Sequence, residues 1–273
     1  MTEIAADRTF VMKCGGSTLA ALPASFFEDL KHIQESGITP VIVHGGGPAI
    51  SDNLTRLGIE TEFVGGLRKT TEQVLDVVEM VLSGSINKQI VRRIQGSHAK
   101  AIGISGVDGG LIQARPVSNS AEVGLVGDVT YVEASIIRAI VQLGYIPVIA
   151  PVGADAVGQR YNINADTAAG AVASHLGVPR MIVVTDVPGI MRTVDGEKQV
   201  LPRVTISEID EMIATGEIYG GMIPKVKAAI ACIQGDVQQV IIVDGSEPQI
   251  LSRVLRGDAV GTRIVRNESI ISQ

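Results

Sequence analysis

The chain contains few aromatic residues and few cysteines. None of its 273 residues is tryptophan and only 3% are aromatic, so its core must be built mainly from aliphatic side chains. The two cysteines, Cys14 and Cys232, lie far apart in the sequence. They therefore suggest neither the closely spaced ligands of a zinc site nor a disulfide framework. This cysteine usage fits a reduced, cytoplasmic setting.

Long apolar runs and excess positive charge are also missing. No apolar stretch approaches the length of a membrane span without an interrupting glycine or proline. The first ten residues, MTEIAADRTF, lack the basic and apolar regions of a signal peptide. The net charge of −6 argues against non-specific binding to nucleic acid. We therefore expect a soluble globular protein with no nucleic-acid or membrane partner.

What the chain does contain is a regular alternation of strand and helix patterns. Short β-branched runs end in glycine-rich turns and lead into helical periodicity, as in RTFVMKCGGS and TPVIVHGGGPAI. This alternation predicts an α/β fold whose mostly parallel sheet carries helices on both faces. Residues 114–133 break the alternation and are expected to hold a hairpin. We expect two lobes, 1–179 and 180–273, that share one continuous sheet.

Most of the predicted strands end in glycine-rich loops. The strand ends read KCGGS, VHGGGP, ISGVDGG, APVG, VTDVPG and VDGS. In open α/β sheets, ligands bind outside the carboxyl ends of the strands. Glycine-rich turns there expose backbone N–H groups, so these loops predict a site for an anionic ligand.

Several common motifs are absent. The sequence has no G-x-x-x-x-G-K-[ST] phosphate loop, no G-x-S-x-G and no H-E-x-x-H, and GGGPAI does not complete G-x-G-x-x-G. A phosphate-handling enzyme without a phosphate loop needs another source of positive charge. Lys13, at the end of the first strand, and Lys225, after GGMIP, are candidates, although either lysine alone is more often simply solvated.

The stretch YNINAD places three polar residues at the start of a predicted helix. Asn162, Asn164 and Asp166 alternate there with other residues. Capping of free backbone N–H groups explains one asparagine but not the whole cluster. Asp166 could hold two lysine ammonium groups in position without cancelling their total charge.

Eight motifs in this order resemble the amino acid kinase family. They are KCGG, VIVHGGGP, GGLRKTTEQVLDVVEMVLSGSINK, GISGVDGG, YNINAD, VTDVPGI, GGMIPKV and GTRIV. The resemblance implies a three-layer αβα sandwich of the carbamate kinase-like type. It further implies an N-terminal lobe that binds N-acetyl-L-glutamate and forms a homodimer, and a C-terminal lobe that binds ATP. The implied reaction moves the γ-phosphate to the side-chain carboxylate, a step of arginine biosynthesis.

The resemblance also assigns roles to individual residues. Three are implied as catalytic, namely Lys13 and Lys225 on the transferring phosphoryl group and Asp166 orienting both. Five are implied to bind the amino-acid substrate: Gly46 and Gly47 through backbone N–H groups, Arg68 on the α-carboxylate, Asn162 on the amide and, more weakly, Asn164. Seven are implied to bind the nucleotide: Gly15, Gly16, Thr185, Asp186, Gly189, Gly221 and Met222.

Neither a general base nor a protein-held metal is expected. A carboxylate substrate is already ionised near about pH 7, so His44 is interpreted as supporting its loop rather than moving protons. No carboxylate cluster suggests a metal site, so Mg²⁺ is expected to bind the ATP phosphates and water. Family members inhibited by arginine carry an additional N-terminal helix. The first predicted strand begins near Arg8, so we expect an arginine-insensitive homodimer.

Three alternatives remain open. A sister kinase could phosphorylate another carboxylate or a carbamate, such as a carrier-linked aminoadipate. A nucleotide-binding regulator without catalysis is a second class, but it would not need Lys13, Asp166 and Lys225 together. A dinucleotide-dependent oxidoreductase is disfavoured by the broken glycine fingerprint.

Overall fold

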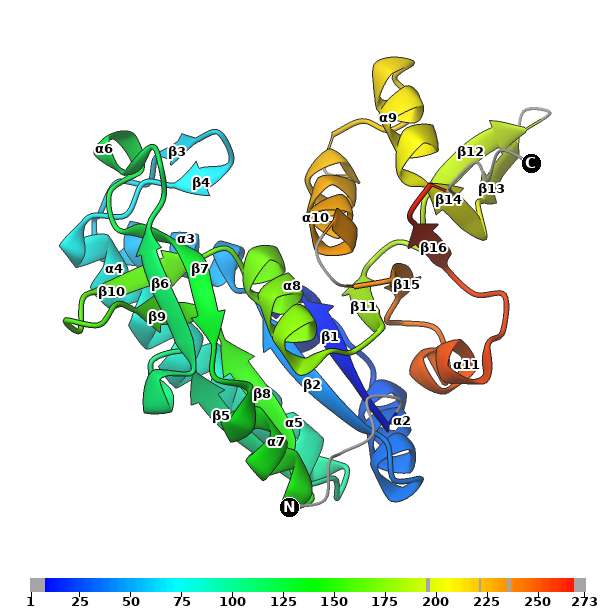
Figure 1. The fold of residues 1–273 in the computed structure, drawn as a ribbon, viewed down its shortest axis with the longest axis horizontal. Coiled ribbons are helices and arrows are strands. Elements are labelled where there is room, and N and C mark those ends of the chain that lie inside the picture. Colours follow the sequence, from blue (N-terminus) through cyan, green and yellow to red (C-terminus); the bar gives the residue numbers. More distant parts are fainter. Residues whose placement is uncertain (1–7, 195–196, 221, 235–236, 268–273) are drawn as a thin grey trace, which may run out of the picture.

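The fold is built on one eight-stranded sheet, seen in a computed structural model that describes residues 8–194, 197–220, 222–234 and 237–267 (Figure 1). In sheet order its strands are β14 (Arg203–Thr205), β16 (Thr262–Val265), β15 (Gln239–Asp244), β11 (Arg180–Thr185), β1 (Thr9–Cys14), β2 (Thr39–His44), β8 (Ile146–Ala150) and β5 (Ala101–Ser105). Neighbouring strands are parallel except for β15 and β16. The prediction of a mostly parallel sheet is confirmed.

Helices cover both faces of this sheet, which makes three layers (Figure 1). One face carries α2 (Ala24–Glu35), α5 (Asn87–Gly96) and α11 (Ile250–Arg256). The opposite face carries α7 (Ala134–Gln142), α8 (Ala165–Leu176) and α10 (Met222–Gln234), with α9 (Ile206–Ala214) packed against α10. Each face buries its own aliphatic cluster, so the predicted αβα sandwich is confirmed.

The alternation of side chains along β1 decides where Lys13 lies. Successive residues of a strand point to opposite faces of the sheet. Phe10, Met12 and Cys14 belong to the cluster beneath α2, whereas Val11 belongs to the cluster beneath α8. Lys13 follows Val11 by two residues and therefore lies on the face of α8, at the carboxyl end of the strand.

Four further strands close into a small barrel beside the sheet. They are β6 (Ile112–Pro116), β7 (Val126–Val132), β9 (Val152–Ala154) and β10 (Arg160–Ile163). The antiparallel pair β6–β7 confirms the hairpin that was expected within 114–133. The closure of the barrel was not predicted, because it depends on β9 and β10, which come later in the sequence.

Short elements surround the carboxyl ends of the strands. Two hairpins are formed by β3 (Phe63–Val64) with β4 (Leu67–Arg68), and by β12 (Met191–Val194) with β13 (Glu197–Val200). The remaining helices are α1 (Gly16–Ala21), α3 (Gly47–Arg56), α4 (Glu72–Glu79), η2 (Met80–Ile86), η3 (Asp108–Gly110) and α6 (Ser120–Val123). A π-helix, η2, joins α4 to α5 without a break in the chain of helical residues.

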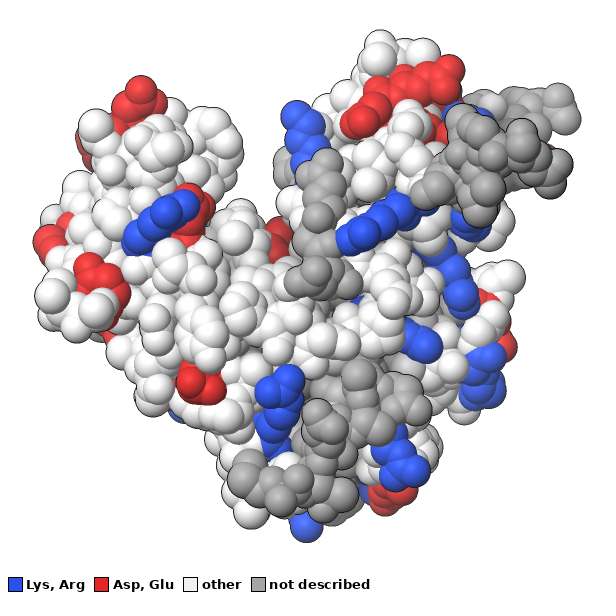
Figure 2. Space-filling view, viewed as in Figure 1, with Lys and Arg blue, Asp and Glu red and all other residues white. Residues whose placement is uncertain are grey.

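The sheet continues across the proposed lobe boundary at 179 and 180, since β1 pairs directly with β11. The surface is hollowed between the part that carries β3, β4 and α6 and the part that carries α9 and α10 (Figure 2). Among the described residues, no helix combines the length and apolarity needed to cross a bilayer.

Candidate active site

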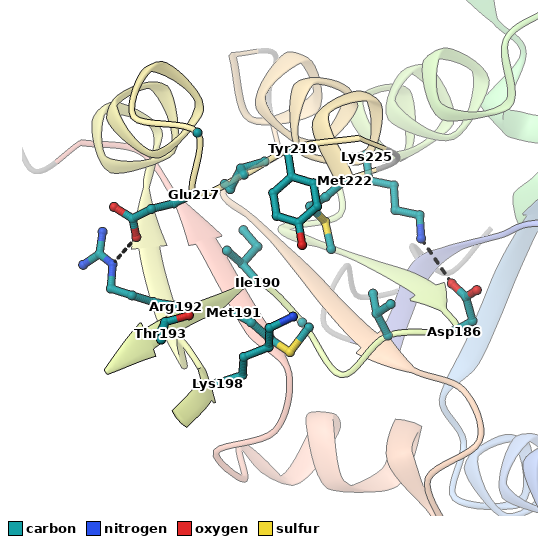
Figure 3. Close-up of a pocket in the computed structure, with 14 residues that line it drawn as sticks. Asp186, Ile190, Met191, Arg192, Thr193, Lys198, Glu217, Tyr219, Met222 and Lys225 are labelled. Atoms are coloured by element: carbon teal, nitrogen blue, oxygen red, sulfur yellow. Dashed lines mark hydrogen bonds and ion pairs between the residues drawn. The ribbon is translucent and has the colours of Figure 1, made fainter. Parts of the chain in front are cut away.

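Two cavities lie at the carboxyl ends of the strands. The small cavity measures about 260 Å³ and is lined by β1, the turn from β2 into α3, β4, η2 and the turn from β10 into α8. The large cavity measures about 550 Å³ and is lined by the loop after β11, the β12–β13 hairpin and the start of α10 (Figure 3).

The two cavities collect most of the residues that the sequence analysis singled out. Eight of these residues line the small cavity: Lys13, Gly15, Gly46, Gly47, Arg68, Asn162, Asn164 and Asp166. Four others line the large cavity: Asp186, Gly189, Met222 and Lys225. Gly15, expected to bind the nucleotide, thus lies at the small cavity.

Three expected nucleotide residues remain. Gly16 is the first residue of α1. Thr185 is buried, and its hydroxyl is hydrogen-bonded to the backbone N–H of Val187 at 3.2 Å, so it holds the loop after β11. Gly221 lies outside the described residues.

Lys13 and Asp166 form an ion pair at the edge of the small cavity. Lys13 Nζ lies 2.9 Å from Asp166 Oδ1, and the two side chains are only 15% and 23% exposed. Asp166 occupies the first turn of α8, where the helix dipole favours a negative charge. The pair therefore holds one ammonium group at the carboxyl end of β1.

Asn164 serves as the N-cap of α8. Its Oδ1 accepts hydrogen bonds from the backbone N–H groups of Asp166 at 2.9 Å and Thr167 at 3.2 Å. The capping interpretation therefore holds for this asparagine. Its oxygen is occupied by the helix, although the residue still lines the small cavity.

Lys225 has a different carboxylate partner from the one expected. Its Nζ lies 3.2 Å from Asp186 Oδ1, across one end of the large cavity (Figure 3). Hydrogen bonds from its own backbone N–H and from Lys225 lower the pKa of Asp186. Asp166 was expected to orient both lysines, but the structure pairs it with Lys13. Each lysine thus has an acid at its own cavity.

Arg68 is buried in the wall of the small cavity with part of its guanidinium unsatisfied. Its Nη2 donates to Gly47 O at 3.0 Å and to Ser51 Oγ at 2.9 Å, and Phe63 stacks on the guanidinium. Arg68 is 7% exposed, and its buried Nη1 has no hydrogen-bond partner among the described residues. Burial lowers the pKa of Arg68. A buried cationic donor without a partner is unfavourable, so this atom favours binding of an anion in the cavity.

Of the glycines after β2, Gly46 allows the backbone to approach η2 closely, and Gly47 leaves open space beside the backbone. A Cβ on Gly46 would lie 2.4 Å from Ile86 Cδ1 and 2.6 Å from Leu82 Cδ2, both of η2. Around Gly47, the first residue of α3, nothing lies within 4 Å of such a Cβ. The first turn of a helix leaves its N–H groups without intrahelical partners, so this turn can donate hydrogen bonds to a ligand.

His44 supports the glycine turn from beneath. Its Nδ1 lies 3.0 Å from Gly45 O, and its Nε2 lies 3.2 Å from Asn87 Nδ2. Since Asn87 Nδ2 can only donate, Nε2 accepts and Nδ1 carries the proton. Asn87, which the sequence analysis missed, also donates to Val148 O at 2.9 Å and so ties the turn to β8. This arrangement agrees with the interpretation of His44 as a supporting residue.

The buried imidazole of His44 should make the folded protein less stable in acid. Burial lowers its pKa from 6.5 to about 4, so the imidazole stays neutral in the folded protein at pH values where the unfolded chain binds a proton. The free energy of unfolding should therefore decrease as the pH falls from 6.5 to about 4, by roughly 3 kcal/mol. Urea titrations across this range measure the effect. A His44→Gln variant should lack this contribution, and an equal slope in both proteins would contradict it.

The large cavity combines apolar walls with cationic groups at its ends. Figure 3 shows Tyr219 and Met191 between the Lys225–Asp186 pair at one end and Arg192 at the other. Arg192 Nε donates to Glu217 Oε2 at 2.7 Å. An apolar cavity with a few charged groups is typical of a site for a small organic anion. The sequence analysis missed these lining residues, because no motif marks the hairpin or the loop before α10.

The described residues contain no group of three or more His, Cys, Asp or Glu that could hold a metal ion.

Comparison with known proteins identifies relatives along most of the chain. The amino acid kinase family matches residues 8–244. The chain is 46% identical to an acetylglutamate kinase of Geobacillus sp. (strain WCH70) over 257 residues, which are 94% of this chain and 98% of that protein. It is 49% identical to an acetylglutamate kinase of Geobacillus kaustophilus (strain HTA426) over 238 residues, or 87% and 90%. The crystal structure of smu.665 from Streptococcus mutans UA159 superposes with a TM-score of 0.82 at 28% identity, covering 95% of this chain and 99% of that one.

Proposed function

The chain belongs to the amino acid kinase family, and from this membership and the two cavities we propose that it is an acetylglutamate kinase. It transfers the γ-phosphate of ATP to the side-chain carboxylate of N-acetyl-L-glutamate, in arginine biosynthesis. The observation that carries the proposal is the small cavity, which is lined both by the Lys13–Asp166 pair and by Arg68, whose buried Nη1 is unsatisfied.

The small cavity binds the amino-acid substrate. Arg68 Nη1 donates to the α-carboxylate, and a planar guanidinium suits a carboxylate better than an ammonium group does. Asn162 binds the amide, and the backbone N–H groups of Gly46 and Gly47 bind the carboxylate that is phosphorylated. Asn164 contributes chiefly by starting α8.

The large cavity binds ATP. Its apolar wall receives the adenine and ribose, and Lys225 with Asp186 marks the end where the phosphates leave toward the small cavity. Gly15, which precedes α1, and Gly16, its first residue, supply backbone N–H groups to the phosphates. The nucleotide roles of Gly189 and Met222, which line this cavity, and of Thr185 and Gly221 belong to the same proposal. In this division residues 1–179 form the substrate lobe and residues 180–273 the nucleotide lobe.

The chemistry is alignment plus stabilisation of charge. The acceptor carboxylate is ionised near about pH 7, so it attacks the γ-phosphorus directly and no side chain needs to remove a proton. Lys13 and Lys225 stabilise the negative charge on the transferring phosphoryl oxygens. Since the described residues offer no metal site, Mg²⁺ is proposed to bind the ATP phosphates and water, and no step is assigned to it.

Trapping of the product tests this function. The purified protein with N-acetyl-L-glutamate and MgATP should form an acyl phosphate, which hydroxylamine converts to a hydroxamate that gives a coloured complex with ferric ion. Glutarate, which lacks the acetamido group, and a reaction without ATP serve as controls. No hydroxamate above these controls would exclude the proposal.

A sister kinase for another carboxylate or a carbamate is the second candidate. The family match and the lysines Lys13 and Lys225 fit either kinase equally well, so only a panel of phosphoryl acceptors distinguishes the two functions. Assembly as a homodimer, insensitivity to arginine and a cytoplasmic location stay predictions.

A further inference from the structure

Thr70 lies behind the small cavity and is completely buried. It lies two residues after the end of β4 and is 0% exposed. Its backbone is fixed on both sides, because its N–H donates to Val123 O and its carbonyl accepts from the N–H of Leu125, each at 2.7 Å. The position of its hydroxyl is therefore set by the fold.

The hydroxyl of Thr70 has only one hydrogen to give. Its Oγ1 lies 2.7 Å from the carbonyl oxygen of Arg68, which can only accept, so the hydrogen is committed to that bond. Asn162 Nδ2 lies 3.2 Å from the same Oγ1. Toward Asn162, Oγ1 can therefore only accept, and the group that faces it must be the NH₂ end of the carboxamide.

The hydrogen bond to Thr70 uses the NH₂ end of the Asn162 carboxamide, so the oxygen is the end that can bind a ligand. A flipped carboxamide would place Oδ1 against Oγ1, and two acceptors with no hydrogen between them repel each other. Asn162 lines the small cavity, and its Oδ1 accepts no hydrogen bond from any described residue. Arg68 lines the same cavity, so its wall combines a cationic side chain with a neutral acceptor.

We propose that Thr70 is a specificity-determining positioning residue, which locks the Asn162 carboxamide with its oxygen ready to accept the N–H of an acylated amino group. The inference rests on the proposed function, because it concerns the acceptor of that reaction. In a substrate analogue with an ester oxygen in place of the N–H, that oxygen would lie against Oδ1. Both atoms can only accept hydrogen bonds, so they would repel each other. The same bond also ties Arg68 to Asn162, since both share the hydroxyl of Thr70.

Two matched substrates test whether Thr70 fixes the orientation of the Asn162 carboxamide. N-acetyl-L-glutamate and its ester analogue, 2-acetoxyglutarate, have the same shape but differ in the N–H. In the wild type, kcat/KM should favour the amide by about tenfold or more, because a site built to bind a substrate N–H rejects an analogue without it. Thr70→Ser keeps the hydroxyl and should keep this ratio. Thr70→Val keeps the shape without the hydroxyl and should bring the ratio close to one, with a raised KM for the amide and an unchanged KM for ATP.

Controls separate the lock from a general structural role. Thr55→Val, at an exposed position of α3, should behave as the wild type. If the valine variant does not fold, Thr70→Cys replaces it, since a thiol is only a weak hydrogen-bond partner. An unchanged amide-to-ester ratio in the folded Val or Cys variant would overturn the inference alone. If the wild type phosphorylates neither acceptor, the proposed function fails and the inference falls with it.

Discussion

Replacing Lys225 with alanine is expected to lower kcat by about 10³-fold and to leave KM for N-acetyl-L-glutamate within a few-fold of the wild-type value. Negative charge develops on the phosphoryl oxygens as the phosphate is transferred, and an ammonium group fixed at that point stabilises the transition state more than the bound substrates. Lys225 stands at the end of the large cavity and is held by Asp186 at 3.2 Å. Steady-state kinetics with each substrate varied in turn measures both constants.

Lys227 provides the matched control for Lys225. It lies two residues further along α10 and is exposed. Lys227→Ala removes the same charge from the same helix without touching either cavity, so its kcat should stay close to that of the wild type. An effect of Lys225→Ala on KM alone, with kcat unchanged, would contradict a role in the transition state.

Replacing Arg68 with lysine should raise KM for the amino-acid substrate by about 100-fold, and KM for ATP by no more than a few-fold. The two terminal nitrogens of the guanidinium have different roles. Nη2 donates hydrogen bonds to Gly47 O and Ser51 Oγ, whereas Nη1 has no partner among the residues that the structure describes and is proposed to bind the substrate. A lysine ammonium carries the same charge on a single nitrogen and cannot donate in both directions. It also loses the stacking on Phe63.

Arg56→Lys is the control for this substitution. Arg56 is exposed in the last turn of α3, so the same change of residue type should leave both KM values as they are. Isothermal titration with N-acetyl-L-glutamate adds a readout that is independent of turnover. Equal increases of both KM values in Arg68→Lys would remove Arg68 from the substrate site.

These two predictions assign different roles to the parts of the chain before and after β11. Lys225 belongs to the part that follows β11, and its loss is expected to act on the rate. Arg68 belongs to the part before β11, and its loss is expected to act on binding of one substrate. Lys13 and Asp166 lie between them, on the strand and the helix at the middle of the sheet. The structure gives each lysine its own acid, so charge is balanced separately at each cavity.

Much of the fold could be predicted from short stretches of sequence. The strand at 39–44 contains the apolar run PVIV shortly before GGGP, and Thr205 begins α9 with a capping box that the sequence TISE already indicates. The site was predictable where a local pattern marks it. Asn164 was recognised as a possible helix cap, and Lys13 as the last charged residue of a strand.

Other features were out of reach because distant segments form them. The partner of Lys225, Asp186, is 39 residues away in the sequence, and both residues had been noticed without their pairing. Asn87 carries no motif of its own, yet it joins His44 to β8. Residues of this kind are recognised only by their neighbours in space.

Local patterns in the sequence specify the layers of this protein and the glycine-rich ends of its strands, because hydrophobic periodicity and turn chemistry act over a few residues. The family was indicated separately, by the resemblance of eight ordered motifs. Only the packing of distant segments shows which acid holds which lysine, which donor of Arg68 is left unsatisfied and which end of Asn162 is bonded to Thr70. The hydroxyl of Thr70 and the amide of Asn162 lie 92 residues apart in the chain. A hydrogen bond over such a separation exists only once the segment after β4 has packed against the barrel.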